Sequence, residues 1–380
     1  MEHIKKVKVA VIGCGAISGI YFENMINRFE ILEVAGCCDL NEQSAAEAGE
    51  KYRIPVLTME EILKNPEIEI VVNLTNPAAH YSVIRRLLEF GKHVYTEKVL
   101  AADIQEARAL VKLADQKKCF LCSAPDTFLG AAVQTARYLI DSGMIGRVTS
   151  CTAVLQRDAR LLAEKFPYTV KKGGGIGIDV GIYYTTAWIQ LLGEAKEVCG
   201  MAGIQEPEQI HYFTRNRNFG ETYAQAAETY LCGVVRFKNG CIGTLHFNSR
   251  SIRTEKPYMA FYGTEGILLL EDPNCFGGSV KVILKGQTEP MEVPYTHGYS
   301  KNCRGLGAAE MAWSLRRGRI PRTEGGMALH ALEILTGVIE SGETGRFYQM
   351  QSKFERQPML PRGFLDEEYA CSQPEGAMYF

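Results

Sequence analysis

Residues 7–18 read Val7-Lys-Val-Ala-Val-Ile-Gly-Cys-Gly-Ala-Ile-Ser18, and this stretch decides the fold. Valine and isoleucine dominate residues 7–12, which is typical of a buried strand in a parallel sheet. The strand ends at Gly13, where the main chain can turn tightly, and at Gly15, where a ligand can approach without meeting a Cβ. Ser18 holds the small-residue position of the Gly-x-Gly-x-x-Gly/Ala pattern. The pattern also occurs in ordinary strand-to-helix turns, but it predicts a pyrophosphate site at a helix N-terminus, formed by Gly13, Gly15, Ala16 and Ile17.

A carboxylate follows the second predicted strand. The apolar run at residues 32–38 ends at Asp39, which lies 24 positions after Gly15. An acidic residue about 20 positions beyond the Gly-rich loop accepts hydrogen bonds from the adenosine ribose of NAD. Leu40 and Asn41 come next, so no adjacent arginine offsets the repulsion between Asp39 and a 2′-phosphate. We therefore predict NAD rather than NADP. The alternative role for Asp39 is the N-cap of a helix that begins near residue 43.

Strand and helix patterns alternate along the first third of the chain. Strands are predicted at 7–12, 32–38, 68–75, 93–97 and 119–124, and helices at about 17–27, 42–52, 78–90 and 103–117. Alternation with short connections indicates parallel strands joined by right-handed crossovers. We predict an α/β fold whose first domain, residues 1–125, is a Rossmann-type doubly wound sheet.

The pattern changes after a predicted helix at 129–141. Period-two strands are predicted at 148–156, 196–204, 230–238, 241–248, 258–262, 267–271 and 280–284, and the one strong helix among them covers 177–192. Such a run indicates a large, open, mostly antiparallel sheet in an α+β domain, residues 126–345. Its uncovered face is a candidate surface for homo-oligomer formation. Helices return at 306–317 and 327–341, and the proline-containing segment 346–380 is expected to form an irregular strap.

Composition excludes several classes of protein. The 380 residues are 46% hydrophobic and carry a formal charge of −2, which offers no positive field for nucleic acid or an anionic membrane surface. No apolar run reaches the length of about 18 residues that a membrane span requires, and the N-terminus does not resemble a signal peptide. We expect a cytoplasmic protein that acts on a small molecule.

Cysteine and histidine spacing does not predict a metal site. The 12 cysteines are scattered, and most fall in apolar strands, where they act as small hydrophobic residues. Cys119 and Cys122 form a Cys-x-x-Cys motif inside a predicted strand, so their side chains point to opposite faces. The seven histidines form no ligand pair at helical spacing, and we predict no metal.

Polar residues follow two of the predicted parallel strands. Thr75 and Asn76 end one strand, and Glu97 and Lys98 end the next. Ligands of doubly wound sheets bind at the carboxyl ends of the strands, so these residues are expected to face the cofactor. His80 lies in the first turn of the following helix, where a neutral imidazole is favoured. It is predicted either to contact the cofactor or to be a packed or solvated histidine.

Two further segments occur in one order with these residues along the chain. They are Gly91-Lys92-His93-Val94-Tyr95-Thr96-Glu97-Lys98 and Gly173-Gly174-Gly175…Asp179-x-Gly181. The chain thereby resembles the Gfo/Idh/MocA family of NAD(P)-dependent sugar oxidoreductases from about residue 7 to 342. In that family the lysine of Glu-Lys-Pro and an Asp-x-x-x-His pair surround the substrate hydroxyl beside the nicotinamide. The resemblance implies that Lys98 and Asp179 are catalytic.

Two positions depart from the family pattern. Tyr183 replaces the histidine, as in the subgroup that includes glucose-fructose oxidoreductase and dihydrodiol dehydrogenase. Val99 replaces the proline of Glu-Lys-Pro, so other contacts must aim Lys98. Asp179 and Tyr183 are four positions apart on a predicted helix, so both side chains can reach one hydroxyl.

Alcohol oxidation requires a proton acceptor as well as a hydride acceptor. We predict that Tyr183 exchanges the hydroxyl proton, while Lys98 orients the hydroxyl and Asp179 positions the sugar or balances the lysine charge. Tyr183 and Lys98 can exchange these roles, because burial would lower the pKa of Lys98. Asp179 alternatively serves as a favourable charge at a helix N-terminus.

Further substrate contacts are predicted in loops. Arg304 lies in one such loop of the second domain, and the other candidates are Asp126, Arg157, Tyr168, Tyr184, His297 and Tyr299. Tyr184 alternatively packs in the core, and the loop residues alternatively lie at the surface. The predicted function is NAD-dependent oxidation or reduction of a ring hydroxyl of a sugar, glycoside or cyclitol. Two alternatives stay open: a glycosidase or glycoside 3-oxidase that forms a C3-keto intermediate with recycled NAD, and a non-catalytic dinucleotide or sugar sensor.

Overall fold

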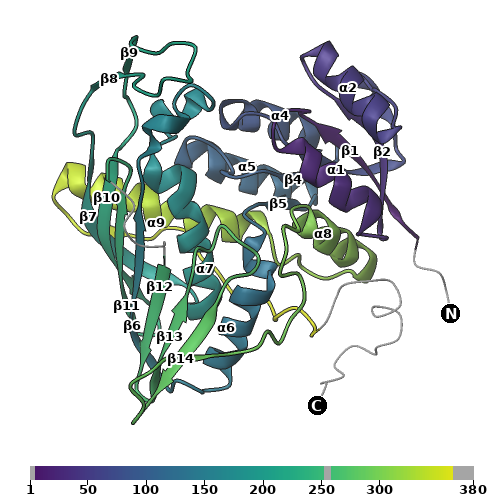
Figure 1. Cartoon of the computed structure of the whole chain (residues 1–380). Coiled ribbons are helices and arrows are strands. Elements are labelled where there is room, and N and C mark those ends of the chain that lie inside the picture. Colours follow the sequence, from purple (N-terminus) through teal and green to yellow (C-terminus); the bar gives the residue numbers. More distant parts are fainter. Residues whose placement is uncertain (1–4, 252–257, 363–380) are drawn as a thin grey trace.

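The computed structural model describes residues 5–251 and 258–362 (Figure 1). Its first sheet is parallel and has the strand order β2-β1-β3-β4-β5. The strands are β1 (Val7–Ile12), β2 (Leu32–Cys38), β3 (Ile68–Asn73), β4 (His93–Thr96) and β5 (Leu121–Ser123). The predicted doubly wound sheet is confirmed, and the carboxyl ends of β1, β3 and β4 lie side by side.

Helices connect these strands. They are α1 (Ser18–Asn27), α2 (Glu42–Tyr52), α3 (Met59–Lys64), α4 (Pro77–Glu89) and α5 (Ile104–Lys117). The short helix α3 was not predicted from the sequence. Its signal is a capping box, in which Thr58 accepts from the N–H of Glu61 and the Glu61 carboxylate accepts from the N–H of Thr58.

The second sheet is large and mostly antiparallel, as predicted. Its order is β15-β14-β13-β12-β6-β11-β10-β7-β16, and within it β6 and β11 pair in parallel. The strands are β6 (Val148–Gln156), β7 (Ala195–Gly203), β10 (Tyr230–Phe237), β11 (Ile242–Asn248), β12 (Tyr258–Gly263), β13 (Gly266–Leu270), β14 (Val280–Leu284), β15 (Met291–Glu292) and β16 (Tyr348–Gln349). A separate hairpin of β8 (Glu208–Ile210) and β9 (Thr222–Ala224), which was not predicted, stands near one end of this sheet (Figure 1).

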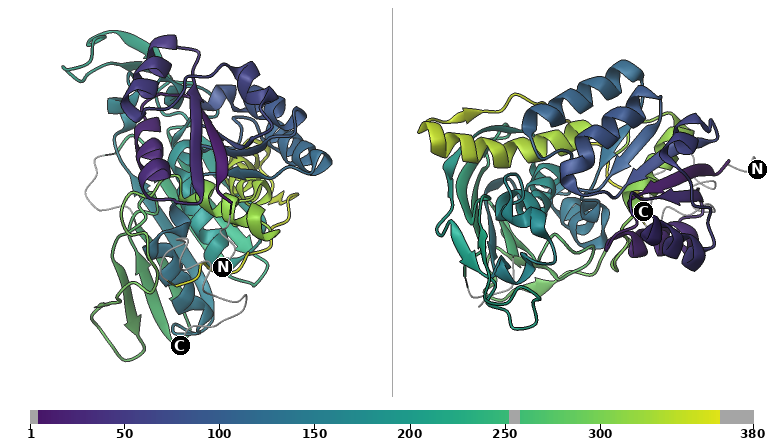
Figure 2. Two further views of the ribbon diagram at one scale, coloured as in Figure 1. Left: turned by 90° about the vertical axis from the view of Figure 1, so that its right-hand side faces the viewer. Right: turned by 90° about the horizontal axis from the view of Figure 1, so that it is seen from above.

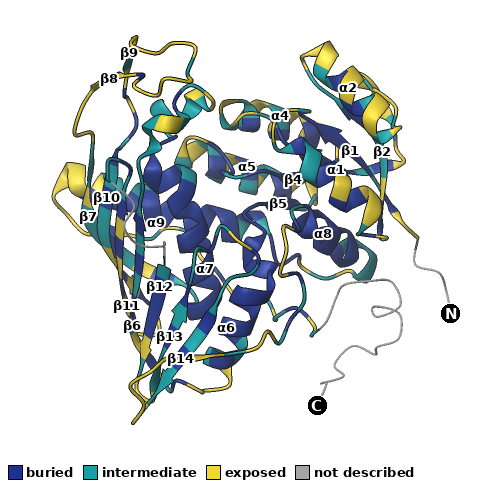
Figure 3. Cartoon of the chain, viewed as in Figure 1, coloured by how far each residue is buried: buried dark blue, intermediate teal, exposed yellow. Residues whose placement is uncertain are grey.

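One face of the large sheet is covered by helices. α6 (Ala131–Asp141), α7 (Ile182–Leu192) and α9 (Gly325–Thr344) lie on its inner side and are largely buried (Figure 3). Helix α9 packs on β7 and β10 and also contacts α5 and β5, so it joins the two sheets (Figure 2). The other face carries exposed apolar side chains, among them Met201, Val234 and Ile242.

The C-terminal part of the chain returns to the first sheet. Helix α8 (Leu306–Arg317) packs against β4, β5 and α1. Beyond α9, residues 350–362 form the expected irregular strap. The Arg322 guanidinium donates to the carbonyls of Pro358 and Met359 at 2.6 and 2.9 Å, and Gln134 accepts from the N–H of Leu360 at 2.9 Å. Residues 363–380 of the predicted strap lie outside the described residues, and the domain boundaries near 125 and 345 stay predictions.

The eleven cysteines in the described ranges are free thiols, and Cys119 precedes β5 rather than lying within it. Across residues 5–251 and 258–362, no helix has both the length and the apolar character needed to cross a bilayer. The same residues contain no cluster of three His, Cys, Asp or Glu side chains that would hold a metal ion.

Candidate active site

The Gly-rich turn packs closely on the neighbouring strand and leaves open space at its tip. Gly13 has φ of +99°, and a Cβ there would lie 2.6 Å from the carbonyl carbon of Leu74. A Cβ at Gly15 would meet nothing within 4 Å. Ile17 is the N-cap of α1, and no side chain caps the helix, while the N–H of Ser18 donates to the Gly15 carbonyl at 3.1 Å. This part of the structure fits a dinucleotide pyrophosphate above Gly15.

Asp39 holds the Gly-rich turn from the end of β2. Its Oδ2 accepts from the N–H of Cys14 at 2.6 Å, and its Oδ1 accepts from the N–H of Asn41 at 2.7 Å. The alternative role of Asp39 as a helix N-cap is wrong, because Asn41 is the N-cap of α2 and accepts from Ser44. A partly exposed carboxylate therefore stands at the position predicted for ribose recognition.

The loops after β3 and β4 are joined by His80. Its Nδ1 lies 2.6 Å from the carbonyl oxygen of Val99, and its Nε2 lies 3.0 Å from that of Thr75. The side chain is fully buried, and burial lowers its pKa. Each ring nitrogen faces a main-chain carbonyl, and the neutral imidazole donates to one of the two, so the structure supports the packed-histidine alternative over a cofactor contact through a ring nitrogen. Asn76 is likewise engaged, because its side chain caps α4.

Glu97 supports the end of β4 and is nearly buried. Its Oε1 accepts from the Tyr21 hydroxyl at 2.7 Å, and its Oε2 accepts from the N–H of Lys98 at 2.9 Å. Tyr21 was not predicted as a site residue, since an aromatic residue on the inner face of a helix has no signal that separates it from a core residue. The Lys98–Val99 peptide bond is cis.

Lys98 and Asp179 form the centre of the candidate site. Lys98 Nζ donates to Asp179 Oδ1 at 2.5 Å and to the Asp179 carbonyl oxygen at 2.8 Å. The Tyr168 hydroxyl donates to the same Oδ1 at 3.1 Å, and an Arg157 guanidinium nitrogen lies 3.6 Å from Oδ2. Lys98 Nζ also lies 5.7 Å from the centroid of the Tyr183 ring. The structure thus brings together Lys98, Asp179, Tyr183, Arg157 and Tyr168.

A local change in helix type places Asp179 and Tyr183. The predicted helix at 177–192 divides into a π-helical turn, Gly177–Gly181, and α7. Two glycines allow this turn to pack on the large sheet. A Cβ at Gly177 would lie 2.5 Å from Leu231 Cδ1, and one at Gly181 would lie 2.7 Å from Phe247 Cε2. The Gly-rich run therefore brings Asp179 within reach of a lysine from the other sheet.

The contact between Lys98 and Asp179 favours the charged form of both side chains. Burial favours neutral forms, but the attraction of Asp179, together with Tyr183 and Tyr168, raises the pKa of Lys98 above its ordinary value. Lys98 in turn holds the pKa of the Asp179 carboxyl below its usual range, despite burial. The expectation of a lowered pKa for Lys98 is wrong, because the ion pair outweighs the effect of burial. Lys98 is an ammonium donor and not a base.

Tyr183 is the phenol best placed to exchange a proton. Burial raises its pKa, while the charges of Lys98 and Arg304 act in the opposite direction. The Arg304 guanidinium donates to Asn302 Oδ1 at 2.9 Å and to Asn274 Oδ1 at 2.8 Å. Burial raises the pKa of Tyr168 to about 12, so Tyr168 stays protonated.

Four predicted substrate contacts lie elsewhere. Tyr184 is buried against Phe247 and reaches Asp272, so its core alternative is correct. Asp126 is also buried, and its Oδ2 accepts from the N–H groups of Gly305 and Gly307, each at 3.0 Å. These two residues support the site from behind and do not line it.

His297 and Tyr299 are buried structural residues rather than surface or substrate residues. His297 Nε2 lies 3.1 Å from the carbonyl oxygen of Leu360 in the strap. Tyr299 has φ of +66° and packs against Phe29, with the Arg28 guanidinium 5.5 Å from its ring centroid. His297 and Tyr299 were predicted as ligand contacts because they are polar residues in predicted loops. In the structure they instead attach these loops to elements that are distant in the sequence.

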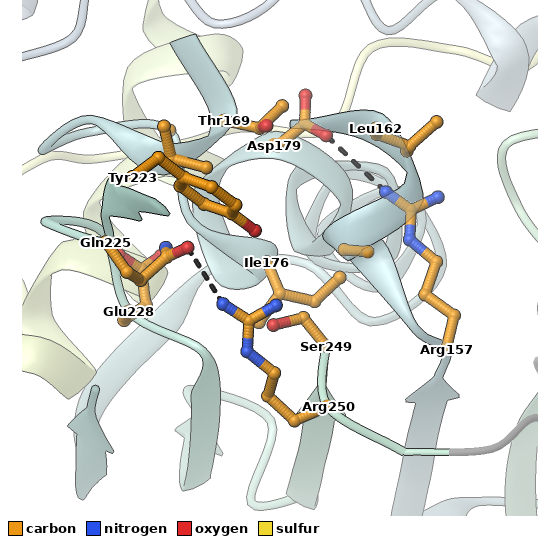
Figure 4. A pocket seen from close by; sticks show the side chains of 13 residues that line it. Arg157, Leu162, Thr169, Ile176, Asp179, Tyr223, Gln225, Glu228, Ser249 and Arg250 are labelled. Carbon is orange, nitrogen blue, oxygen red and sulfur yellow. Dashed lines mark hydrogen bonds and ion pairs between the residues drawn. The ribbon is translucent and has the colours of Figure 1, made fainter. Parts of the chain in front are cut away.

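A polar pocket opens beside Asp179 (Figure 4). Its charged groups come from Arg157, Asp179, Glu228 and Arg250. The cavity volume is about 20 Å³. That space accommodates a water molecule or one small polar group, but not a whole sugar ring. Burial raises the pKa of Glu228, whose Oε1 faces the N–H of Ile178 at 3.4 Å.

The chain has a parallel sheet with a Gly-rich turn, and this sheet is joined to an open sheet whose covering helix faces Lys98. These features define a two-domain dinucleotide-binding protein. Residues 7–124 match the oxidoreductase family model GFO_IDH_MocA, described as an NAD-binding Rossmann fold, and residues 133–269 match the GFO/IDH/MocA C-terminal domain. The chain belongs to the Gfo/Idh/MocA family.

Three individual proteins that resemble this chain share 28% or less of their aligned residues with it. An uncharacterized oxidoreductase of Schizosaccharomyces pombe, C115.03, is 28% identical over 37% of this chain and 40% of its own length. Trans-1,2-dihydrobenzene-1,2-diol dehydrogenase of Bos taurus is 24% identical over 72% of this chain and 76% of its own length. A structure of levoglucosan dehydrogenase with NADH has a TM-score of 0.79, at 18% identity, and covers 92% of this chain and 100% of its own. The chain thus spans less than half the length of the first of these relatives, and the structural likeness shows the fold.

Proposed function

We propose that this protein is an NAD-dependent oxidoreductase that transfers a hydride between nicotinamide and a secondary ring hydroxyl of a sugar, glycoside or cyclitol. The observation that carries the proposal is the Lys98–Asp179 ion pair, which lies at the carboxyl end of β4 and 5.7 Å from the Tyr183 ring. Ligands of doubly wound sheets bind at that edge. Similarity to the dihydrodiol dehydrogenase and to the levoglucosan dehydrogenase of Pseudarthrobacter phenanthrenivorans supports the same class of reaction.

The cofactor fits the residues present. The open space at Gly15 and the uncapped start of α1 suit the pyrophosphate, and Asp39 suits the ribose hydroxyls. Bound there, NAD would supply the hydride acceptor or donor. The Asp39 carboxylate, followed by Leu40 and Asn41, favours NAD over NADP because it would repel a 2′-phosphate.

The chain's own residues supply the proton chemistry. Lys98 donates a hydrogen bond to the substrate oxygen and carries the positive charge that stabilises a developing alkoxide. Tyr183 accepts the hydroxyl proton in oxidation and returns it in reduction. Asp179 keeps Lys98 protonated, and Tyr168 and Arg157 hold the carboxylate in place. Arg304 beside Tyr183 stabilises the phenolate form.

We also propose a homo-oligomer that buries the uncovered face of the large sheet. Val234, Ile242 and Met201 are 39%, 43% and 71% exposed, and they lie on the neighbouring strands β10, β11 and β7. Apolar side chains gathered on one sheet face favour burial against a partner. Light scattering of the protein and of a Val234→Glu, Ile242→Lys double variant tests this assembly.

Incubation of the purified protein with NAD and a panel of sugars, inositols and glycosides tests the activity. We expect NADH absorbance to rise together with product masses that have lost two hydrogens. Cleavage of a glycoside without NADH accumulation would instead support the glycosidase with recycled NAD. If NAD binds but no substrate of the panel changes in mass, the proposed activity is wrong.

A further inference from the structure

Two arginine side chains converge on the pocket beside Asp179. Arg157 follows β6 and Arg250 follows β11, and the two strands pair in parallel up to Gln156 and Asn248. The N–H of Arg157 donates to the carbonyl of Asn248 at 3.0 Å, which keeps the two strand ends together. Figure 4 shows both guanidinium groups directed into the same pocket. The register of the sheet thus places two positive charges side by side.

The Arg250 guanidinium forms no close ion pair among the described residues, and the carboxylates of Asp158 and Glu206 act on it only from a greater distance. Its Nη2 donates to the uncharged Gln225 side chain at 2.9 Å, and its Nε is buried with no partner in the described part of the chain. Arg160 in the same region differs, because both oxygens of Asp158 accept from its guanidinium at 2.9 and 2.7 Å. A half-buried guanidinium without a carboxylate is costly unless a ligand supplies the opposite charge.

Arg157 also retains binding capacity. Its guanidinium lies 3.6 Å from Asp179 Oδ2, beyond hydrogen-bond distance, and the charge of Asp179 is already balanced by Lys98 at 2.5 Å. Arg157 Nε is buried and lacks a partner among the residues that the structure describes. Burial raises the pKa of Glu228, whose Oε1 faces the N–H of Ile178. The three cations Lys98, Arg157 and Arg250 thus outnumber the two carboxyl groups, Asp179 and Glu228, in and beside this pocket.

We propose that this pocket binds a carboxylate carried by the substrate, so that the preferred substrates are acidic sugars such as uronates or aldonates. The inference rests on the dehydrogenase function proposed above and specifies its substrate class. Guanidinium groups bind a planar carboxylate through paired N–H donors. The cavity of about 20 Å³ admits one small polar group between the two arginines. The ring hydroxyl would then lie at Lys98 and Tyr183, with Asp179 between the two subsites.

Paired substrates test the proposal. Glucuronate and glucose share one ring and differ in the carboxylate, and glucose 6-phosphate provides the phosphate arm. We expect kcat/KM for glucuronate to exceed that for glucose by at least about tenfold, the effect of one charge-assisted contact of about 1.4 kcal/mol. In Arg250→Gln this ratio should fall to near one. Arg85→Gln, a matched change on the exposed surface of α4, should keep the wild-type ratio.

Equilibrium binding separates this inference from the proposed activity. We expect glucuronate to raise the melting temperature of the NAD-loaded wild-type protein, and to raise it much less in Arg250→Gln, whether or not turnover occurs. Equal effects of glucuronate and glucose, a preference for glucose 6-phosphate alone, or an unchanged response in Arg250→Gln would each overturn the carboxylate subsite. Turnover of neutral sugars with no acidic preference would leave the dehydrogenase proposal standing and refute this one.

Discussion

Lys98 Nζ and Asp179 Oδ1 lie 2.5 Å apart although the two residues are separated by 81 positions in the chain. One follows a strand of the parallel sheet, and the other lies in a π-helical turn packed on the large sheet. The contact therefore fixes how the two halves of the site meet. Because each charge favours the charged form of the other, the proposed mechanism gives Lys98 the role of a preorganised donor and not of a proton acceptor.

Replacement of Lys98 tests that donor role. In Lys98→Met the substrate oxygen loses its charged hydrogen-bond donor, so we expect kcat to fall by about 10²- to 10³-fold. NAD affinity, measured by calorimetry, should change little, because Asp39 and the Gly-rich turn hold the other end of the cofactor. Lys64→Met, on the exposed end of α3, is the matched control. Near-normal turnover by Lys98→Met that still binds NAD would contradict the mechanism.

The two neighbouring tyrosines separate catalysis from packing. Tyr183→Phe removes the proton-exchanging hydroxyl, and we expect a loss of about 10²- to 10⁴-fold in kcat. Tyr184→Phe removes a buried hydroxyl that reaches Asp272 at 3.5 Å, so it should keep kcat and lower stability by about 1 kcal/mol. Steady-state rates and urea unfolding measure the two effects. Equal rates for both variants would refute the assignment of Tyr183.

The pH dependence of the rate should follow Tyr183. Burial raises the pKa of its phenol, so the phenolate is the minor form near neutral pH and increases as pH rises. We expect kcat/KM for alcohol oxidation to rise about tenfold per pH unit between roughly pH 7 and 9. Lys98 and Asp179 do not titrate in that window, because their pKa values move away from it. A Tyr183→Phe variant with the same slope would show that another group is the base.

Cofactor preference should depend on Asp39. The wild-type carboxylate is expected to favour NAD over NADP by at least about tenfold in kcat/KM. Asp39→Ser removes the repulsion and one partner of the Cys14 N–H, so we expect weaker NAD binding and a loss of that preference. Parallel titrations with the two cofactors measure the ratio, and Asn41→Ser is the nearby control. An NADP preference in the wild-type protein would contradict the role given to Asp39.

His330 makes the fold sensitive to acid. Its Nε2 accepts from the N–H of Ala195 at 2.9 Å, and burial lowers its pKa from 6.5 to about 4. Between these values the unfolded chain binds a proton that the folded chain does not, so stability falls as pH decreases from 6.5 to 4. The loss from this residue is on the order of 3 kcal/mol at its largest. Urea unfolding across this range should show a weaker pH dependence in His330→Gln, and an unchanged dependence would contradict this origin.

Periodicity predicted the elements of the parallel sheet closely, because its strands are continuous apolar runs and its helices have polar caps. The strand predicted at 7–12 is observed as Val7–Ile12, and that at 32–38 as Leu32–Cys38. The π-helical turn was not predictable, since residues 177–192 keep one apolar helical pattern while the glycines change only how closely the turn packs. The β8–β9 hairpin is short, and its residues have no period that distinguishes them from a loop.

The sequence predicted the site correctly where its residues follow strand ends. The prediction failed where residues of loops are buried against other parts of the fold. Lys98, Asp179 and Tyr183 lie together as expected, because Lys98 follows a strand at the carboxyl edge of the parallel sheet and the turn Gly177–Gly181 brings Asp179 to that edge. His297 and Tyr299 sit in polar segments, yet their partners are Leu360 and Arg28, far away in sequence. Arg250 was not recognised, since only the register of β6 and β11 reveals its proximity to Arg157.

The buried imidazole of His80 ties the loop after β3 to the loop after β4 through one carbonyl on each side. Any shift of the first loop on nucleotide loading would therefore be transmitted to the backbone next to Lys98. For protein engineers who exchange cofactor specificity within this scaffold, the two segments must be transplanted as one unit together with the histidine. A graft of either segment by itself would separate the imidazole from the Val99 carbonyl and misalign the neighbouring Lys98 amine, to which the proposed mechanism assigns the substrate hydrogen bond.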